Sequence, residues 1–350
     1  MQEQPGSLLD SASPAQPGVG RRTIAAALVA GIALFMGLEA WWVSTPGPAL
    51  RATSRVVEIP AHRGLRDVAR ILDEAGVIRS PLGFTALTIA RGSMRSLKAG
   101  EYEFPQGATT LAVLTMLESG QVLQHSVVFR EGSTISELTA QLSGEGLVQA
   151  DDFRRAARDA PLLRSLDVPA DTLEGYLFPD TYQFVKGMTA EEILERMVAR
   201  MRERVAPDIM AAARARQLSF HQLLTLASII EKEAVERSEM PLISAVFWNR
   251  LKLDMPLQAD PTVQYAVGKE RQRLGRDDLL VDSPFNTYRR VGLPPGPIAS
   301  PGLAAIRAAA NPAPVRYLYF VAIDDRRHQF STTLAEHNAA VAKYRLVRSH

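Results

Sequence analysis

The sequence predicts an α+β protein with a single N-terminal transmembrane helix, a small α+β domain and a larger α+β domain. Three observations lead to this prediction. An apolar run covers residues 23–43, a strand-and-helix unit occurs twice within residues 55–150, and helical and strand patterns alternate over residues 151–350. A chain of 350 residues is long enough for two or three domains, each with its own core.

The composition excludes several classes of function. The chain has 40 Lys and Arg against 38 Asp and Glu, so no strong field favours nucleic acid as a partner. It has no cysteine, which excludes thiol catalysis, thiolate metal sites and disulfides. Sequence motifs for phosphate loops, dinucleotide binding, serine nucleophile elbows and zinc peptidases do not occur. We therefore expect no cofactor and no metal.

The N-terminal segment predicts a membrane anchor. Residues 1–22 are rich in Ser, Pro, Gly and Gln and predict a disordered cytoplasmic tail. The run at 23–43, TIAAALVAGIALFMGLEAWWV, is long enough to span a bilayer and is interrupted only by Glu39. Arg21 and Arg22 before it predict that the N-terminus is cytoplasmic. The alternative is a cleaved signal peptide, but the long apolar run without a clear cleavage site favours an uncleaved anchor.

A strand-and-helix unit occurs at 57–78 and again at 127–148. Each copy predicts a short strand, a turn, an amphipathic helix and a glycine stop. Such a unit cannot bury its apolar face alone, so the two copies, with a strand at 98–104 and a helix at 109–120 between them, predict one domain over 55–150. A repeated unit of this kind outside the cytoplasm resembles the LysM type of glycan-binding module. The alternative is a plain spacer domain.

The larger domain, 151–350, begins with helices and then the segment EGYLFPDTYQF at 174–184. In this segment Tyr176 and three further aromatic residues flank a turn that contains Asp180. Alternating aromatic side chains could line a sugar subsite, because their rings stack on sugar faces, or could form an ordinary core strand. A long charged helix follows, with a break expected at Pro207.

The central stretch of the chain is LLTLASIIEKEAVER, residues 223–237. Its apolar residues follow helical spacing and predict a buried helix that ends with two carboxylates, Glu231 and Glu233. A carboxyl group half-buried among Leu and Ile side chains has a raised pKa, which suits a proton donor at neutral pH. The alternative is that both carboxylates belong to a solvated helix end.

Polar residues follow in the segment MPLQADPTVQYAVG, residues 255–268. The segment predicts an extended strand, in which Gln258, Asp260, Thr262 and Gln264 share one face. Such a row of amide, carboxylate and hydroxyl groups could bind sugar hydroxyls. It could equally be the exposed face of a strand.

A segment rich in proline and glycine, SPFNTYRRVGLPPGPIASPG, covers residues 283–302. Its composition is too rigid for a flexible linker and predicts an ordered loop held against a core. This loop would present Asn286, Thr287 and Tyr288 to a groove. Beyond it, the apolar run at 317–323 predicts a buried strand.

Taken together, six ordered segments resemble the endolytic murein transglycosylase family, also called the YceG-like family. They are EGYLFPDTY, LASIIEKEA, VFWNRL, MPLQADPTVQYAVG, SPFNTYRRVGLPPGPIASPG, and YLYFVA followed by HQFSTTLAEHN. The resemblance extends from about residue 55 to the end. A single anchor before a LysM-like region is also the layout of that family, and the resemblance makes 151–350 the catalytic domain.

The resemblance implies a lytic transglycosylase that cleaves MurNAc–GlcNAc bonds of nascent peptidoglycan. The products end in 1,6-anhydro-MurNAc, and the reaction limits glycan strand length. The C6 hydroxyl of the sugar is the nucleophile in this chemistry, so one glutamate serves first as acid and then as base. The family's catalytic glutamate lies in the IIEKE motif, where we expect Glu233, with Glu231 as the second choice.

The resemblance also implies a location, partners and a substrate groove. The protein would be a single-pass protein of the bacterial inner membrane with a periplasmic catalytic domain, working beside penicillin-binding proteins. Its rivals are a non-catalytic peptidoglycan-binding scaffold and a hydrolase that uses two carboxylates. The residues expected to line the groove, with the last two near it, are Gln258, Asp260, Thr262, Asn286, Thr287, Tyr288, Tyr176 and Asp180.

Overall fold

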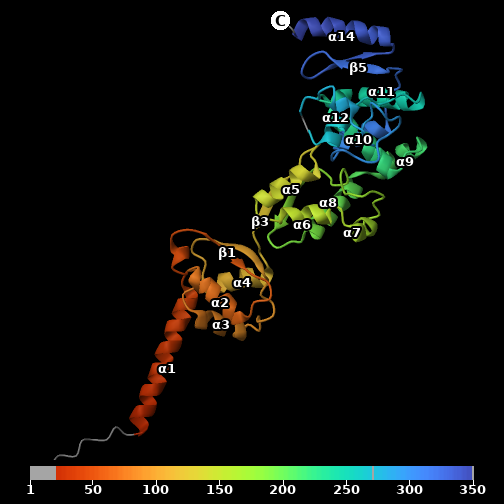
Figure 1. Ribbon diagram of the computed structural model, residues 1–350. Helices are drawn as coiled ribbons and strands as arrows, with labels where there is room; N and C mark the ends of the chain where they lie inside the picture. The colour runs from red at the N-terminus through yellow and green to blue at the C-terminus, as the bar shows by residue number, and fades with distance from the viewer. Residues whose placement is uncertain (1–20, 270–271, 349–350) are drawn as a thin grey trace, which may run out of the picture. The chain divides into compact units, whose positions relative to one another are not determined.

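Helices and short strands alternate along the chain, so the predicted mixture of α and β structure is confirmed (Figure 1). The computed structural model describes residues 21–269 and 272–348. The predicted tail lies almost entirely outside these residues, and its disorder stays a prediction. The chain divides between Leu123 and Gln124 into two compact units, here called the first and the second unit.

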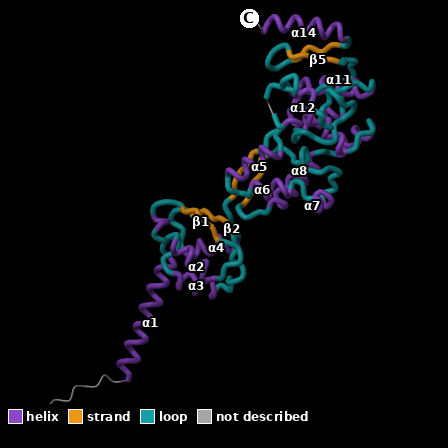
Figure 2. The backbone as a smooth tube through the Cα atoms, in the orientation of Figure 1, coloured by secondary structure: helices purple, strands orange, loops and turns teal. Residues whose placement is uncertain are grey.

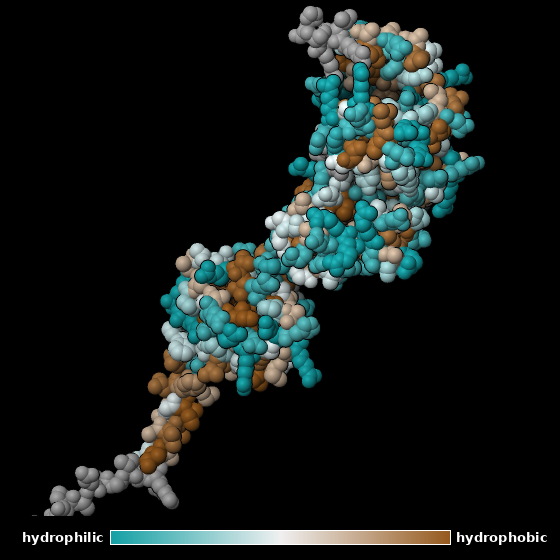
Figure 3. Space-filling view, viewed as in Figure 1, coloured by the Kyte–Doolittle hydropathy of each residue, from teal (hydrophilic) through white to brown (hydrophobic). Residues whose placement is uncertain are grey.

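The apolar run at the N-terminus forms α1, Arg21–Ser44. Its stretch from Thr23 to Ser44 is long and apolar enough to cross a membrane, and its most apolar window is not buried against the rest of the chain. Figure 3 shows this helix as a brown hydrophobic surface along its length. By length and composition this helix could cross a membrane, and a signal sequence near the N-terminus would pass the same test.

The rest of the first unit is a two-stranded sheet with three helices. Strands β1 and β2 are antiparallel, with Val57 opposite Tyr102. Their inner faces and the helices enclose a core that includes Leu72, Phe84 and Leu114. These elements are η1 (Ala49–Arg51), β1 (Arg55–Ile59), α2 (Leu65–Glu74), α3 (Pro81–Ala90), β2 (Gly100–Phe104) and α4 (Thr110–Ser119).

The second unit starts with the second copy of the repeated sequence, which forms the predicted strand and helix, β3 and α5. The structure places the two copies in different units, whereas the sequence analysis expected both within 55–150. The reason is the partner of β3: it pairs antiparallel with β4, with Val127 opposite Tyr182 (Figure 2). Tyr182 and Phe184 of β4 are buried in the core, so these aromatic side chains are core residues and not a sugar platform.

The remaining elements of the second unit are mostly helical. The long charged helix is broken at Pro207, as expected. The elements of the second unit are β3 (Gln124–Val128), α5 (Ile135–Gly144), α6 (Ala150–Ala156), α7 (Ala160–Ser165), β4 (Thr181–Val185), α8 (Ala190–Arg204), α9 (Pro207–Ala215), α10 (Phe220–Glu233), η2 (Arg237–Glu239), α11 (Met240–Lys252), α12 (Asp260–Val267), η3 (Asp278–Leu280), α13 (Leu303–Ala310), β5 (Tyr319–Ala322), β6 (His328–Ser331) and α14 (Leu334–Arg348).

The predicted buried helix is α10, and it is the centre of the second unit. Every residue from Leu223 to Ile230 is buried, and the helix packs against α11, α12 and α13. Ser219 begins it with a capping box, in which its side chain accepts a hydrogen bond from the Gln222 backbone. The helix ends at Glu233, because Ala234 is already extended.

One predicted strand is a helix, and the strand expected at 317–323 forms but is less buried than predicted. The stretch after Gln258 is the helix α12 and not a strand, so its alternate polar residues do not share a strand face. Asp260 and Pro261 occupy its first turn, where a carboxylate and a proline both favour a helix start. Strand β5 is only half-buried, because it pairs with β6 in a two-stranded sheet that α14 contacts from outside.

Candidate active site

Glu233 is held at the C-terminal end of α10, partly exposed to solvent. Burial, helped by the negative charge of Asp260, raises the pKa of Glu233 to about 8. At neutral pH this carboxyl group therefore carries a proton, unlike an ordinary glutamate. A protonated carboxyl group at an accessible position can donate its proton to a leaving oxygen.

Glu231 is partly buried too, but it has a structural partner. Its Oε2 accepts a hydrogen bond from the backbone N–H of Gly302 at 2.9 Å. Burial raises the pKa of Glu231, and the bond from Gly302 opposes that rise. The neighbouring Lys232 donates from Nζ to the carbonyl oxygen of Gly132 at 3.2 Å. Both side chains tie α10 to adjacent loops, so the end of this helix is not a freely solvated one.

Asp260 and Tyr288 interact electrostatically with Glu233, and Gln258 lies two residues before Asp260. The hydroxyl of Tyr288 donates to Oδ1 of Asp260 at 2.5 Å, and burial followed by this bond raises the pKa of Tyr288. Gln258 and Asp260 are exposed, and Tyr288 is half-buried. We call these residues, with Glu233, the Glu233 cluster. It contains an acid, a carboxylate, an amide and a phenol that solvent or a ligand can reach.

Gln258 adopts an unusual backbone conformation. Its φ of 54° lies in the left-handed region, which non-glycine residues rarely occupy and which is enriched at functional sites. The side-chain oxygen of Gln258 accepts a hydrogen bond from Arg250 Nη1 at 3.1 Å. The strained backbone and the bonded amide fix this side chain at the edge of the cluster.

Arg250 is a site residue that the sequence analysis missed. It is only 8% exposed, and its guanidinium group also donates to the carbonyl oxygens of Leu318 (2.8 Å), Pro256 (3.1 Å) and Leu257 (2.9 Å). A buried guanidinium group with this many acceptors holds the chain just before Asp260 in place. The available signal was an arginine embedded in the apolar helix VFWNRL.

Three residues expected to line the groove are buried behind the cluster instead. Thr262, Asn286 and Thr287 are at most 1% exposed. The Thr262 and Thr287 hydroxyls lie 2.9 Å apart, and Thr287 also accepts a bond from the backbone of Ala259. Asn286 donates to two loop carbonyls and accepts from the Tyr288 backbone. These side chains fasten the start of α12 and the loop that carries Tyr288, so they position the cluster.

Two further expected residues have other partners. Tyr176 is buried, and its hydroxyl lies 2.7 Å from Nδ1 of His221, in the first turn of α10. Glu233 ends the same helix, so His221 and Glu233 lie about 18 Å apart along the helix axis, at 1.5 Å per residue. Asp180 forms an ion pair with Arg200 at 2.8 Å. The structure does not bring Tyr176 or Asp180 to the cluster.

A cavity of about 770 Å³ lies beside α12. Its lining includes Tyr265 and Phe285, whose rings are 4.9 Å apart, and the basic residues Arg154 and Arg158. Glu233 does not line this cavity. Within residues 21–269 and 272–348, no group of three or more His, Asp and Glu side chains is arranged to hold a metal ion.

Comparison with known proteins identifies the family. The model of the YceG-like family matches residues 57–343. A protein of Bacillus subtilis (strain 168) named endolytic murein transglycosylase is 35% identical over 304 residues, covering 82% of this chain and 84% of the relative. A protein of the same name from Streptococcus pneumoniae serotype 2 is 32% identical over 320 residues, and the match covers 82% of this chain but only 58% of that longer relative.

The same relationship is found among solved structures. The crystal structure of a YceG-like protein from Listeria monocytogenes is 34% identical in sequence, with a TM-score of 0.58. The match covers 82% of this chain and 98% of that one. The family match includes the helix that ends at Glu233 and the loops that complete the cluster. The resemblance stated from the motifs is confirmed: this chain belongs to the YceG-like family, whose matched relatives are named endolytic murein transglycosylases.

Proposed function

We propose that this protein is a membrane-anchored lytic transglycosylase that cleaves MurNAc–GlcNAc bonds of nascent peptidoglycan and leaves 1,6-anhydro-MurNAc ends. The names of the relatives support peptidoglycan as the substrate. The observation that carries the proposal is the raised pKa of Glu233, at about 8, in a position that is partly exposed. With this pKa the carboxyl group of Glu233 is protonated at neutral pH, as a general acid must be.

In the proposed reaction Glu233 transfers two protons. It first donates its proton to the glycosidic oxygen, and the bond from that oxygen to C1 of MurNAc breaks. The carboxylate then accepts the proton of the C6 hydroxyl as O6 forms a new bond to C1. No water is consumed, and Glu233 ends in its starting state, so the cycle needs no second acid or base from the protein.

Asp260, Gln258 and Tyr288 support this reaction in the proposal. Burial, helped by the charge of Asp260, keeps Glu233 protonated, and the carboxylate of Asp260 is suited to stabilise positive charge that develops near C1. Tyr288 orients Asp260 through its hydroxyl, and Arg250 holds Gln258. Gln258 is exposed and is suited to bind a sugar hydroxyl or acetamido group.

We also propose a location and a wider role for the protein. α1 serves as an uncleaved anchor in the inner membrane, with the N-terminus in the cytoplasm and both units in the periplasm. The first unit, with its LysM-like strand and helix, is the candidate glycan-binding part. By cutting strands as they are made, the enzyme limits their length, and penicillin-binding proteins are its expected neighbours.

Product analysis tests the proposed reaction. Purified protein is incubated with uncrosslinked glycan strands, and the new ends are identified by mass spectrometry. We expect anhydro-MurNAc ends, which are lighter than reducing MurNAc ends by one water. Reducing ends would instead indicate a two-carboxylate hydrolase, with Asp260 as the second group. Intact strands that remain bound to the protein would indicate a scaffold.

A further inference from the structure

Helix α3, Pro81–Ala90, has an outward face without any charged group. Its sequence, PLGFTALTIA, contains no charged residue. Phe84 and Thr88 face the core, while Leu82, Ala86 and Ile89 are exposed at helical spacing. Leu82 is 67% exposed and Ile89 is 53% exposed. A surface helix normally carries charged residues on its outer face, so this apolar stripe requires a partner.

The start of α3 is fastened to α1. Ser80, the N-cap residue of α3, donates from its hydroxyl to Glu39 of α1 at 2.6 Å. Gly83 lies so close to α1 that a Cβ there would come within 2.6 Å of the Glu39 carboxylate and 3.0 Å of Val43. A side chain at position 83 would therefore displace the Glu39 carboxylate, and the hydrogen bond from Ser80 satisfies this one carboxylate of the apolar run.

The contact fixes the height of α3 relative to the anchor. Glu39 lies five residues before Ser44, the end of α1, which is about 7.5 Å along the helix. Arg79, just before α3, lies over the ring of Trp41 with 5.8 Å between its guanidinium carbon and the ring centroid. Trp and Arg at the end of a span mark the lipid headgroup level. The beginning of α3 is therefore level with the last turn of the span.

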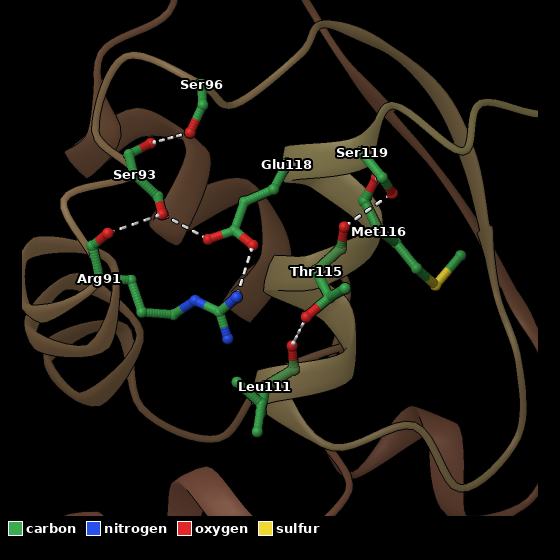
Figure 4. A network of polar contacts seen from close by, with 8 residues as sticks. All are labelled: Arg91, Ser93, Ser96, Leu111, Thr115, Met116, Glu118 and Ser119. Carbon is green, nitrogen blue, oxygen red and sulfur yellow. Dashed lines mark hydrogen bonds and ion pairs between the residues drawn. The ribbon is translucent and has the colours of Figure 1, made fainter.

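Basic residues follow α3 in the chain. Arg91, at the C-terminal end of α3, pairs with Glu118 of α4 at 3.1 Å, and Ser93 donates to the same carboxylate (Figure 4). This network holds the end of α3 against the unit. Arg95 and Lys98 follow and are exposed, and Lys98 donates from Nζ to the carbonyl oxygen of Ser119 at 3.1 Å. Positive side chains beside an apolar face suit the phosphate groups of a lipid surface.

We propose that α3 lies in the outer surface of the bilayer that α1 spans, with Leu82, Ala86 and Ile89 among the lipid acyl chains and Arg95 and Lys98 at the lipid phosphates. This inference rests on the proposal that α1 is an uncleaved anchor. α3 lies on the side of the first unit from which α1 extends, and β1 lies on the far side (Figure 1). The contact presses the first unit against the membrane and fixes its orientation there.

Site-specific labelling of the full chain tests this contact. The protein has no cysteine, so each introduced cysteine is unique. Leu82→Cys and Ile89→Cys place a fluorophore on the stripe, and Val56→Cys, at a residue 49% exposed on β1, is the matched control. Leu34→Cys, at a residue 76% exposed on α1, reports on the anchor itself. Each variant is reconstituted in lipid nanodiscs and quenched either by nitroxide-labelled lipid or by aqueous iodide.

The expected result is loss of fluorescence with nitroxide lipid at positions 82, 89 and 34, and loss with iodide at position 56. Quenching of positions 82 and 89 by iodide as strong as that at position 56, with position 34 quenched by lipid, would overturn the docking of α3 while leaving the anchor intact. Absence of lipid quenching at position 34 would contradict the anchor and the docking together.

Discussion

At the scale of single residues, two neighbouring glutamates of one motif have different environments. Burial and the negative charge of Asp260 act on Glu233, whereas Glu231 accepts a backbone hydrogen bond from Gly302. Helical spacing in the sequence predicted that either Glu231 or Glu233 could be half-buried with a raised pKa, and the choice of Glu233 came with the family resemblance. It could not predict the approach of Asp260, because that depends on how a second helix, 27 residues later, packs beside the first. It also missed Arg250, whose role follows from its four acceptors and not from its place in the sequence.

The pH dependence of cleavage follows from the raised pKa. Activity should fall as pH rises through about 8, because Glu233 loses the proton that it must donate. Asp260→Asn removes the charge that helps to raise this pKa, so the descending limb should move to lower pH. Initial rates of strand cleavage at a series of pH values measure both effects.

The matched control for this shift is Asp282→Asn. Asp282 is an exposed carboxylate paired with Arg290, and its removal should leave the limb in place. A limb that is unchanged in Asp260→Asn, or that shifts equally in both variants, would show that Asp260 does not act on the proton donor.

The same pKa has a consequence for stability. The folded protein keeps Glu233 protonated up to about pH 8, whereas its ordinary pKa is 4.5, so between these values the folded state binds more protons. Stability of the wild type must therefore fall as pH rises through this window. Glu233→Gln cannot ionise and should be more stable than the wild type at pH 8, by on the order of 2 kcal/mol, below the ceiling set by about 1.4 kcal/mol per pKa unit. Urea unfolding at acidic and alkaline pH measures this difference in the free energy of unfolding. The difference between Glu233→Gln and the wild type should be absent below pH 4.5.

At the scale of elements, the site is built where α10 meets α12 and the proline-rich loop. The sequence predicted both α10 and the ordered loop. The structure buries α10 around Ile230 and the loop around Ile298, as expected. It did not predict α12. Alternate polar residues suggested a strand, while the Asp-Pro pair at 260 and 261 and the glycine at 268 carried helix start and stop signals that prevailed.

The hydrogen bond between α10 and the loop can be tested directly. Ser228 is fully buried; its hydroxyl donates to Thr225 at 2.8 Å and accepts from the backbone N–H of Ile298 at 3.1 Å. Ser228→Ala leaves that N–H without its partner and should cost about 1–3 kcal/mol in the free energy of unfolding. Ser143→Ala is the control, because Ser143 donates to Ala140 in the same way but is not buried. Equal unfolding midpoints in urea for the two variants would contradict the role of this bond.

At the scale of the whole molecule, the chain consists of two units, the first of which begins with the apolar helix α1, and the Glu233 cluster lies wholly in the second. The repeated sequence motif predicted two strand-and-helix units correctly. It could not show that they belong to different units, because the partner of β3 is a strand more than 50 residues later. Backbone bonds from the loop after β3 to Ser300 reinforce this attachment: Gly132 donates at 2.8 Å, and Ser133 accepts at 2.9 Å.

Two fragments test where the second unit begins. Residues 124–350 keep β3 and α5 and should unfold cooperatively and cleave soluble glycan strands. Residues 151–350 lose the strand partner of β4 and the buried side chains of Val127, Leu138 and Leu142, so this fragment should not fold into a stable unit. Circular dichroism during urea unfolding distinguishes them, and a cooperative transition in the shorter fragment would contradict the assignment.

The most direct test of the account replaces each glutamate of the motif in turn. Glu233→Gln should abolish the formation of anhydro-MurNAc ends while retaining a cooperative unfolding transition, because the amide keeps the shape but cannot exchange the proton. Glu231→Gln, with an amide oxygen still able to accept from Gly302, should retain cleavage. Anhydro ends formed by Glu233→Gln at the wild-type rate, or lost only in Glu231→Gln, would contradict the central claim that Glu233 carries both proton transfers.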